Sequence, residues 1–203
     1  SLAMDLLDEG TKTRTALEIS EELQMLGSSL GTGAELDACA VYLNTLKDKL
    51  DPSLELFADV VLNPSFPQSD FERLRQQTLA RIQREKVTPI LMAIRVVPGL
   101  LYGSDHAYGC PLTGSGTEAS VSAMTRERLA EFHKTWFKPN NATLVITGDI
   151  TLDEIKSRLE KLFKSWAPGD VPGKNIAAVA DKSNSEVYLI DRPGSQQSII
   201  IAG

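Results

Sequence analysis

The side chains best suited to metal or redox chemistry are few, because the sequence has only two histidines and two cysteines. His106 is followed four residues later by Cys110, but no third ligand stands near them, and a zinc site needs three or four protein ligands. His133 has no possible ligand three or four residues away, so we expect it on the surface of a helix. Cys39 and Cys110 form no CxxC pair and are expected to be free thiols. These residues predict neither a metal site nor a redox centre.

Serine chemistry has one superficial candidate, the stretch Leu112-Thr-Gly-Ser-Gly116. It does not match GxSxG, the pattern that exposes a nucleophilic serine on a sharp strand-to-helix turn. We therefore expect Gly114-Ser115-Gly116 to be an ordinary flexible turn. The sequence also contains no GxxxxGK[ST] phosphate-binding loop.

The composition is that of a globular protein, with 203 residues, 42% of them hydrophobic and 24% charged. The net charge of −6 argues against a nucleic-acid partner, which would need a basic face. No apolar run approaches the length of about 18 residues that a membrane-spanning helix requires. We therefore expect no nucleic acid and no membrane span.

A set of amphipathic helices and a few strands must position these residues. Thr15 and Thr151 each have a glutamate three residues on, as in a capping box, and Gly27 is a typical helix end. Apolar spacing predicts helices over residues 2–7, 15–27, 51–63, 67–86, 90–101, 125–136 and 152–166, with Pro98 expected to kink or shorten its helix. Alternation and turn residues predict strands over residues 28–32, 36–46, 141–150, 186–191 and 197–202, the first two as a hairpin. The expected fold class is α+β, a mostly antiparallel sheet covered by helices.

The chain is predicted to contain one main unit and the start of a second. Residues 1–166 are expected to form an α+β unit that lacks its first strands, because the sequence begins inside a helix. A turn-rich linker over 167–184 and the strand pair of a following unit over 185–203 complete the chain. We expect that strand pair to fill the open sheet edge, from the same chain or from a neighbour in a strand-swapped homodimer.

Two helical segments, Ser1–Thr11 and Phe71–Arg81, appear in the order and spacing of a known family's motif helices. They resemble the metal-motif helix and the glutamate-bearing helix of the pitrilysin/insulinase-type zinc metallopeptidases, to which mitochondrial processing peptidase units are similar. Further similar segments are Leu26–Leu30, Asp51–Pro64, Asp105–Gly109 with Gly114, Trp136–Ala142 and Gly148–Asp149. The resemblance implies the α+β fold of a processing-peptidase-like metallohydrolase unit.

The family's chemistry needs a helical HxxEH motif, in which two histidines bind zinc and the glutamate activates a water, and a zinc-binding glutamate on a later helix. The resemblance places Ser1 and Asp5 at the two histidines, Met4 at the catalytic glutamate and Arg81 at the distal glutamate. Met4 cannot move a proton and Arg81 cannot bind a cation, so the resemblance implies no catalytic residue, metal site or cofactor in this chain. We expect an ion pair between Asp5 and Arg81 in place of the metal, the alternative being Arg81 with Glu85 one turn on.

The resemblance implies a catalytically inactive half of a bacterial-type zinc protease. Such a half would close the peptide chamber or scaffold an active HxxEH-bearing half, fused or separate, which would carry the zinc. A peptide is then the expected substrate, and a periplasmic or exported location is favoured over a cytoplasmic one. One alternative is a structural or assembly protein of the same fold. The other is an active zinc metalloendopeptidase with unusual ligands, namely Asp5, Glu9 or Glu85 with His106.

Overall fold

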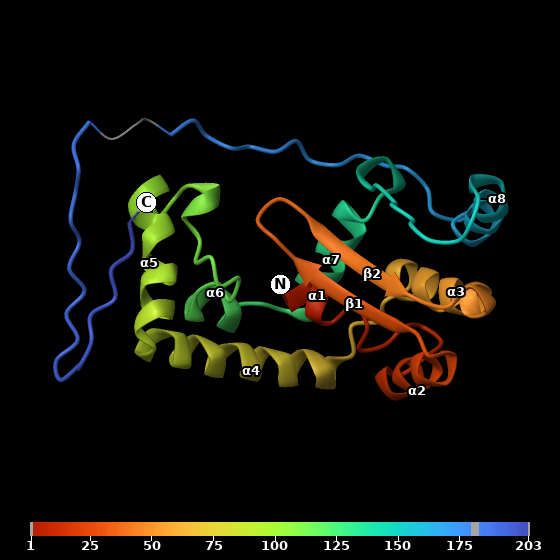
Figure 1. Ribbon diagram of the computed structural model, residues 1–203, viewed down its shortest axis with the longest axis horizontal. Coiled ribbons are helices and arrows are strands. Elements are labelled where there is room, and N and C mark those ends of the chain that lie inside the picture. The colour runs from red at the N-terminus through yellow and green to blue at the C-terminus, as the bar shows by residue number, and fades with distance from the viewer. Residues whose placement is uncertain (1, 180–182, 203) are drawn as a thin grey trace.

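The computed structural model describes residues 2–179 and 183–202. Its helices are α1 (Leu2–Asp5), α2 (Ala16–Leu26), α3 (Leu50–Leu62), α4 (Gln68–Val87), α5 (Pro89–Tyr102), α6 (Glu118–Ser122), α7 (Arg126–Trp136) and α8 (Leu152–Leu162) (Figure 1). Its strands are β1 (Ser29–Ala34) and β2 (Cys39–Asn44), and short 3-10 turns lie at Lys47–Lys49, Ala107–Gly109 and Pro139–Asn141. No helix in this part of the chain is long and apolar enough to cross a membrane.

The two strands form an antiparallel hairpin, in register from Ser29 opposite Asn44 to Ala34 opposite Cys39. The hairpin crosses the middle of the molecule, with α1 beside it and α2 and α3 at the end away from its turn (Figure 1). Helices therefore surround a small antiparallel sheet, and the predicted α+β class is confirmed.

The hydrophobic core is built around α1 and the turn that follows it. Side chains from α2, α3, α4, α7 and the segment between α3 and α4 pack on this centre. The buried members of the cluster are Leu2, Met4, Leu6, Leu7, Ile19, Leu56, Val60, Phe66, Phe71 and Leu129. Helix α1, which the resemblance aligns with the family's metal-motif helix, thus lies in the middle of the hydrophobic core.

Local sequence sets several of the helix ends. Thr15 and Thr151 form complete capping boxes with the glutamates three residues on, as predicted. Gly27 ends α2 in the left-handed conformation, at φ 62°. Thr88 is extended because it precedes Pro89, and this break separates α4 from α5, which stands at an angle to it (Figure 1).

The three predicted strands outside the hairpin are not formed. Residues 142–149 are unpaired, and Leu144 and Val145 are 51% and 77% exposed. Residues 186–191 and 197–202 likewise form no strand, so their predicted pairing with the sheet is not found within this chain, and pairing with the sheet of a neighbouring copy stays a prediction. The sequence has β-forming side chains at these places, but a strand also needs a partner strand, which propensity does not supply.

Several helices differ from the predictions, and α1, predicted over residues 2–7, ends at Asp5. Helix α5 continues through Pro98 to Tyr102, so that proline does not shorten it. Helix α8 ends at Leu162, four residues before the predicted end. Helix α6 was not predicted; it is short and is capped by Thr117.

Candidate functional site

The helix that the resemblance assigns to the metal motif is packed into the core. Met4 is 1% exposed and Leu2 is 8% exposed, while Asp5 is half-buried at the end of α1. Ser1, the remaining position of the motif, lies outside the described residues. The side chain at the position of the catalytic base is therefore surrounded by apolar groups.

Arg81, at the distal ligand position, does not pair with Asp5. Its ion-pair partner among the described residues is Glu85, with 3.8 Å between Nε and Oε1. The predicted Asp5 pair is thus wrong, and the alternative pairing one turn on is found. The α1 region meets α4 through Glu9 and Arg73 instead, 2.6 Å apart. Arg81 lies eight residues beyond Arg73, which is about 12 Å of helix, too far along α4 for the same contact.

The side chains considered as unusual zinc ligands belong to separate groups. Glu9 is ion-paired with α4, Glu85 lies in a cluster with α5, and Nε2 of His106 contacts a backbone carbonyl at 2.9 Å. Cys39 and Cys110 are both free, as predicted. Within residues 2–179 and 183–202, no three His, Cys, Asp or Glu side chains form a possible metal-binding group. The described residues do not fit zinc, and we assign them no metal-dependent step.

Three carboxylates, Asp5, Asp8 and Glu9, crowd the end of α1. Burial raises the pKa of Asp8, a backbone hydrogen bond opposes the shift, and the charges of Glu9 and Asp5 add to it. The ionised form of Asp8 is therefore less favourable in the folded protein than in the unfolded chain.

Glu85 is the centre of a buried polar cluster that joins α4, α5 and the loop before α6. Its Oε2 accepts hydrogen bonds from Nη1 of Arg95 at 2.5 Å, Oγ of Ser115 at 2.6 Å and Oγ1 of Thr113 at 3.0 Å. Arg95 also donates from Nη2 to the carbonyl of Gly116 at 2.8 Å. Burial alone would raise the pKa of Glu85, but the donors Ser115, Arg95 and Thr113 outweigh it, so the pKa is lowered. Within the cluster the charges of Glu85 and Arg95 neutralise each other, and the hydrogen bonds link α4, α5 and the loop before α6.

The cluster corrects one prediction and was missed by sequence reasoning. Gly114-Ser115-Gly116 is not a free turn, because the serine is 3% exposed and hydrogen-bonded. Two patterns could have revealed the cluster. Arg95 is the one charged residue between positions 86 and 105, inside an apolar helix. Glu85 lies on the same buried face of α4 as Phe71, Thr78 and Ile82.

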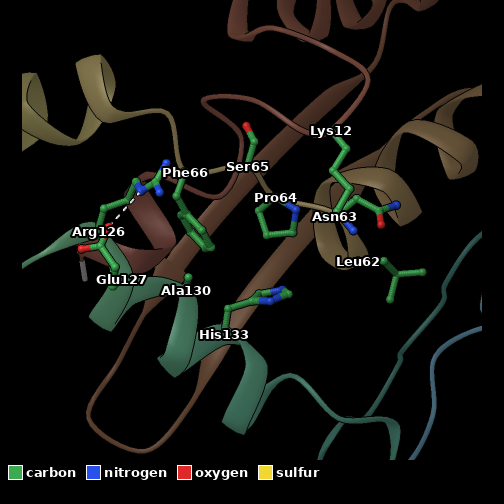
Figure 2. Close-up of a pocket in the computed structure, with 10 residues that line it drawn as sticks. All are labelled: Lys12, Leu62, Asn63, Pro64, Ser65, Phe66, Arg126, Glu127, Ala130 and His133. Atoms are coloured by element: carbon green, nitrogen blue, oxygen red, sulfur yellow. Dashed lines mark ion pairs between the residues drawn. The ribbon is translucent and has the colours of Figure 1, made fainter.

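A groove of about 400 Å³ lies between α7 and the segment that follows α3. Figure 2 shows Pro64 and Phe66 on one side and Ala130 and His133 of α7 on the other. Basic groups stand at both ends, with Lys12 beside Asn63 at one and Arg126 beside Glu127 at the other (Figure 2). The remaining lining residues are Leu62 and Ser65.

His133 forms part of the groove wall and is not the surface residue predicted from its spacing. Its Nε2 lies 2.8 Å from the carbonyl of Val61, so this nitrogen carries the proton. The ring stacks on Phe137 at 4.4 Å between centroids and meets Phe66 edge-on at 5.9 Å. Burial lowers the pKa of His133, the hydrogen bond opposes this, and the charge of Lys138 adds to it, so the ring is neutral at neutral pH. The spacing of His133 four residues after the buried Leu129 and four before Phe137 was the available signal.

Two family descriptions match this chain, each in a separate part. The description "Insulinase (Peptidase family M16)" matches residues 4–96. The description "Peptidase M16 inactive domain" matches residues 123–203. The two matches belong to one peptidase family and cover both the α1–α4 region and the region from α7 onward.

Individual proteins agree with these matches. An uncharacterised zinc protease of Mycobacterium leprae is 31% identical over 160 residues, which is 79% of this chain and 35% of that protein. A probable mitochondrial-processing peptidase subunit beta of Arabidopsis thaliana is 24% identical over 190 residues, 92% of this chain and 35% of that protein. The crystal structure of a peptidase M16 inactive domain from Pseudomonas fluorescens superposes with a TM-score of 0.81 at 28% identity, covering 88% of this chain and 43% of that one. The chain thus spans well under half of each of these relatives, and it belongs to the insulinase family of peptidases.

Proposed function

We propose that this chain is a non-catalytic half of a bacterial-type zinc protease, which closes a peptide-holding chamber or scaffolds an active half. The observation that carries the proposal is that the side chains at the family's catalytic-glutamate position and distal zinc-ligand position are not those that the chemistry needs. Met4 lies in the core where the family's catalytic glutamate is expected, and Arg81 is ion-paired to Glu85 where a zinc ligand is expected. Neither side chain transfers a proton or binds a cation at neutral pH.

The partner, on this proposal, is an active half that carries the HxxEH motif and the zinc, fused or as a separate chain. The names of the relatives support this, since they include zinc proteases, a processing-peptidase subunit and an inactive domain. The substrate class is then a peptide held between the two halves.

Reconstitution with an HxxEH-bearing half from the same organism tests the proposal. We expect the two chains to form a complex by size-exclusion chromatography and the complex to cleave a fluorogenic peptide faster than the active half does alone. A complex with an unchanged rate would favour the structural or assembly role. The absence of any complex would contradict both roles.

Metal analysis separates the proposal from an active zinc peptidase with unusual ligands. The isolated chain, stripped of metal, dialysed against zinc and then against buffer, should retain well below one equivalent of zinc and cleave no peptide. One tightly bound zinc per chain would show that the chain carries a metal site of its own.

A further inference from the structure

The groove beside α7 has the size and lining of a small binding site. Its volume of about 400 Å³ is within the range of ligand pockets, and its walls are apolar at Pro64, Phe66 and Ala130 (Figure 2). Basic side chains stand at its two ends. We propose that this groove binds a peptide segment in which acidic side chains flank one large apolar side chain.

The charges at the ends of the groove are available to a ligand. The ammonium group of Lys12 makes no ion pair or hydrogen bond with any described residue. Arg126 contacts its neighbour Glu127 through Nε at 3.4 Å, and its two terminal nitrogens have no hydrogen bond within the described ranges. The groove lining holds these two cations and one carboxylate, Glu127, which gives it a net charge of +1, whereas the whole chain carries a net charge of −6. Such a reversal favours acidic over basic ligands.

The wall between these ends is rigid. Phe66 is 3% exposed and holds φ at 47°, a left-handed conformation that is unfavourable for a bulky residue. Strain of this kind persists where packing over-determines it, and it concentrates at binding sites. Here the packing comes from His133, which is fixed by its stack on Phe137 and by its bond to Val61. A preformed wall lowers the ordering cost of binding.

The proposal stands apart from the role as a protease half. It uses neither Met4 nor Arg81, and it makes a claim about the isolated chain. Failure of the reconstitution experiment would leave it standing, and its own failure would leave the protease role standing.

Amide NMR of the isolated ¹⁵N-labelled chain tests the proposal with acetyl-Glu-Ala-Phe-Ala-Glu-amide as the probe. We expect saturable shifts confined to residues 62–66, 126–133 and Lys12. A peptide with both glutamates replaced by glutamine should bind about three- to tenfold more weakly, as expected for the loss of two exposed ion pairs. A peptide with alanine in place of phenylalanine should lose most of the affinity.

Protein variants locate the site. Lys12→Ala and Arg126→Ala should each weaken binding about two- to fivefold. Ala130→Trp should block the groove without removing a charge, and its exposed helical position should tolerate the substitution. The matched control is Lys134→Ala, an exposed cation of α7 that does not line the groove. Equal binding of the glutamine peptide, full binding to a folded Ala130→Trp variant, shifts elsewhere or no shift at all would each overturn the proposal.

Discussion

The carboxylate of Glu85 and the guanidinium of Arg95 meet at 2.5 Å, although they belong to helices separated by the break at Thr88. Both side chains are almost fully buried, at 4% and 10% exposure. A buried ion pair is tolerated only when further hydrogen bonds satisfy the remaining polar atoms of the two charged groups. Here Ser115 and Thr113 donate these additional hydrogen bonds to the carboxylate of Glu85. This contact fixes how α5 and the loop before α6 sit on α4.

Removal of one partner should therefore be costly. We expect Glu85→Gln to lower the free energy of unfolding by about 3–5 kcal/mol, because Arg95 is left buried and uncompensated. Urea denaturation at pH 7 measures it. The control is Glu160→Gln, which removes an exposed pair with Lys156 and should cost less than about 1 kcal/mol. A loss for Glu85→Gln as small as the control's would show that the cluster does not stabilise the fold.

The same cluster predicts a stability change at acid pH. The pKa of Glu85 is lowered from 4.5 in the folded protein, so below about pH 4.5 the unfolded chain binds more protons than the native one. The contribution of Glu85 is therefore complete above that pH and is lost as the pH falls through the lower folded pKa. The difference in unfolding free energy between the natural chain and Glu85→Gln should be full at pH 7 and should shrink toward pH 3. An unchanged difference at the two pH values would contradict this.

Asp8 is expected to behave in the opposite sense. Its pKa is raised from 3.8, first by burial, so its contribution to stability is present at low pH and is lost as the pH rises through the folded pKa. Asp8→Asn should therefore be more stable than the natural chain at pH 7, and the gain should vanish below the unfolded pKa. Thermal melts at pH 7 and pH 3 measure both. Asp170→Asn, an exposed carboxylate, serves as the control and should change little at either pH.

The parts of the fold that could be predicted from the sequence are those determined by interactions between residues a few positions apart. Thr15 and Thr151 start their helices because the complete capping box lies within one turn. Residues 142–149 could not be assigned in this way, because whether Leu144 and Val145 enter a strand depends on a partner distant in sequence.

In the candidate site, too, contacts between residues close in sequence could be predicted and contacts between separate helices could not. The sequence placed Arg81 one turn from Glu85, and that local pair is found. The Asp5 pair required knowing where α4 crosses the α1 region, and the crossing at Arg73 is set by packing. The Glu85–Arg95 contact also depends on the angle at Thr88, which spacing alone does not give.

Gly10 should be intolerant of any side chain. It follows the α1 region with φ at 153°, and an added Cβ would lie 3.1 Å from Oγ of Ser65 and 3.2 Å from Cγ of Pro67. Gly10→Ala is expected to lower stability by about 1–3 kcal/mol through backbone strain. Gly33→Ala in β1 is the matched control, since its Cβ would meet nothing within 4 Å, and it should cost nothing. Equal melting temperatures for the two variants would show that Gly10 is not under conformational constraint.

The segment after the linker should be dispensable for folding. None of its large apolar side chains is buried: Val187, Leu189 and Ile200 are 95%, 92% and 91% exposed. The others, Tyr188, Ile190, Ile199 and Ile201, are 43–53% exposed, so the segment adds little to the core. The contacts that hold the linker, from Lys174 to Asp37 and from Ala177 to His106, lie before it. Deletion of residues 185–203 should therefore shift the melting temperature by less than about 2 °C, since a loss of 1 kcal/mol would shift it by about 2–4 °C in a chain of this size. Solubility should rise, because an exposed run of β-forming side chains invites pairing with other chains.

Leu56→Ala is the positive control for the melting-temperature measurement on the truncated chain. It truncates a fully buried core side chain and should lower the free energy of unfolding by about 2–5 kcal/mol. If the truncated chain instead melts several degrees lower, as Leu56→Ala does, the segment must pack on the sheet or on a second copy in solution. Light scattering then separates the two cases, because only the second makes the loss depend on protein concentration. An unchanged melting temperature with a monodisperse monomer leaves the core around α1, and not the C-terminal segment, as the source of stability.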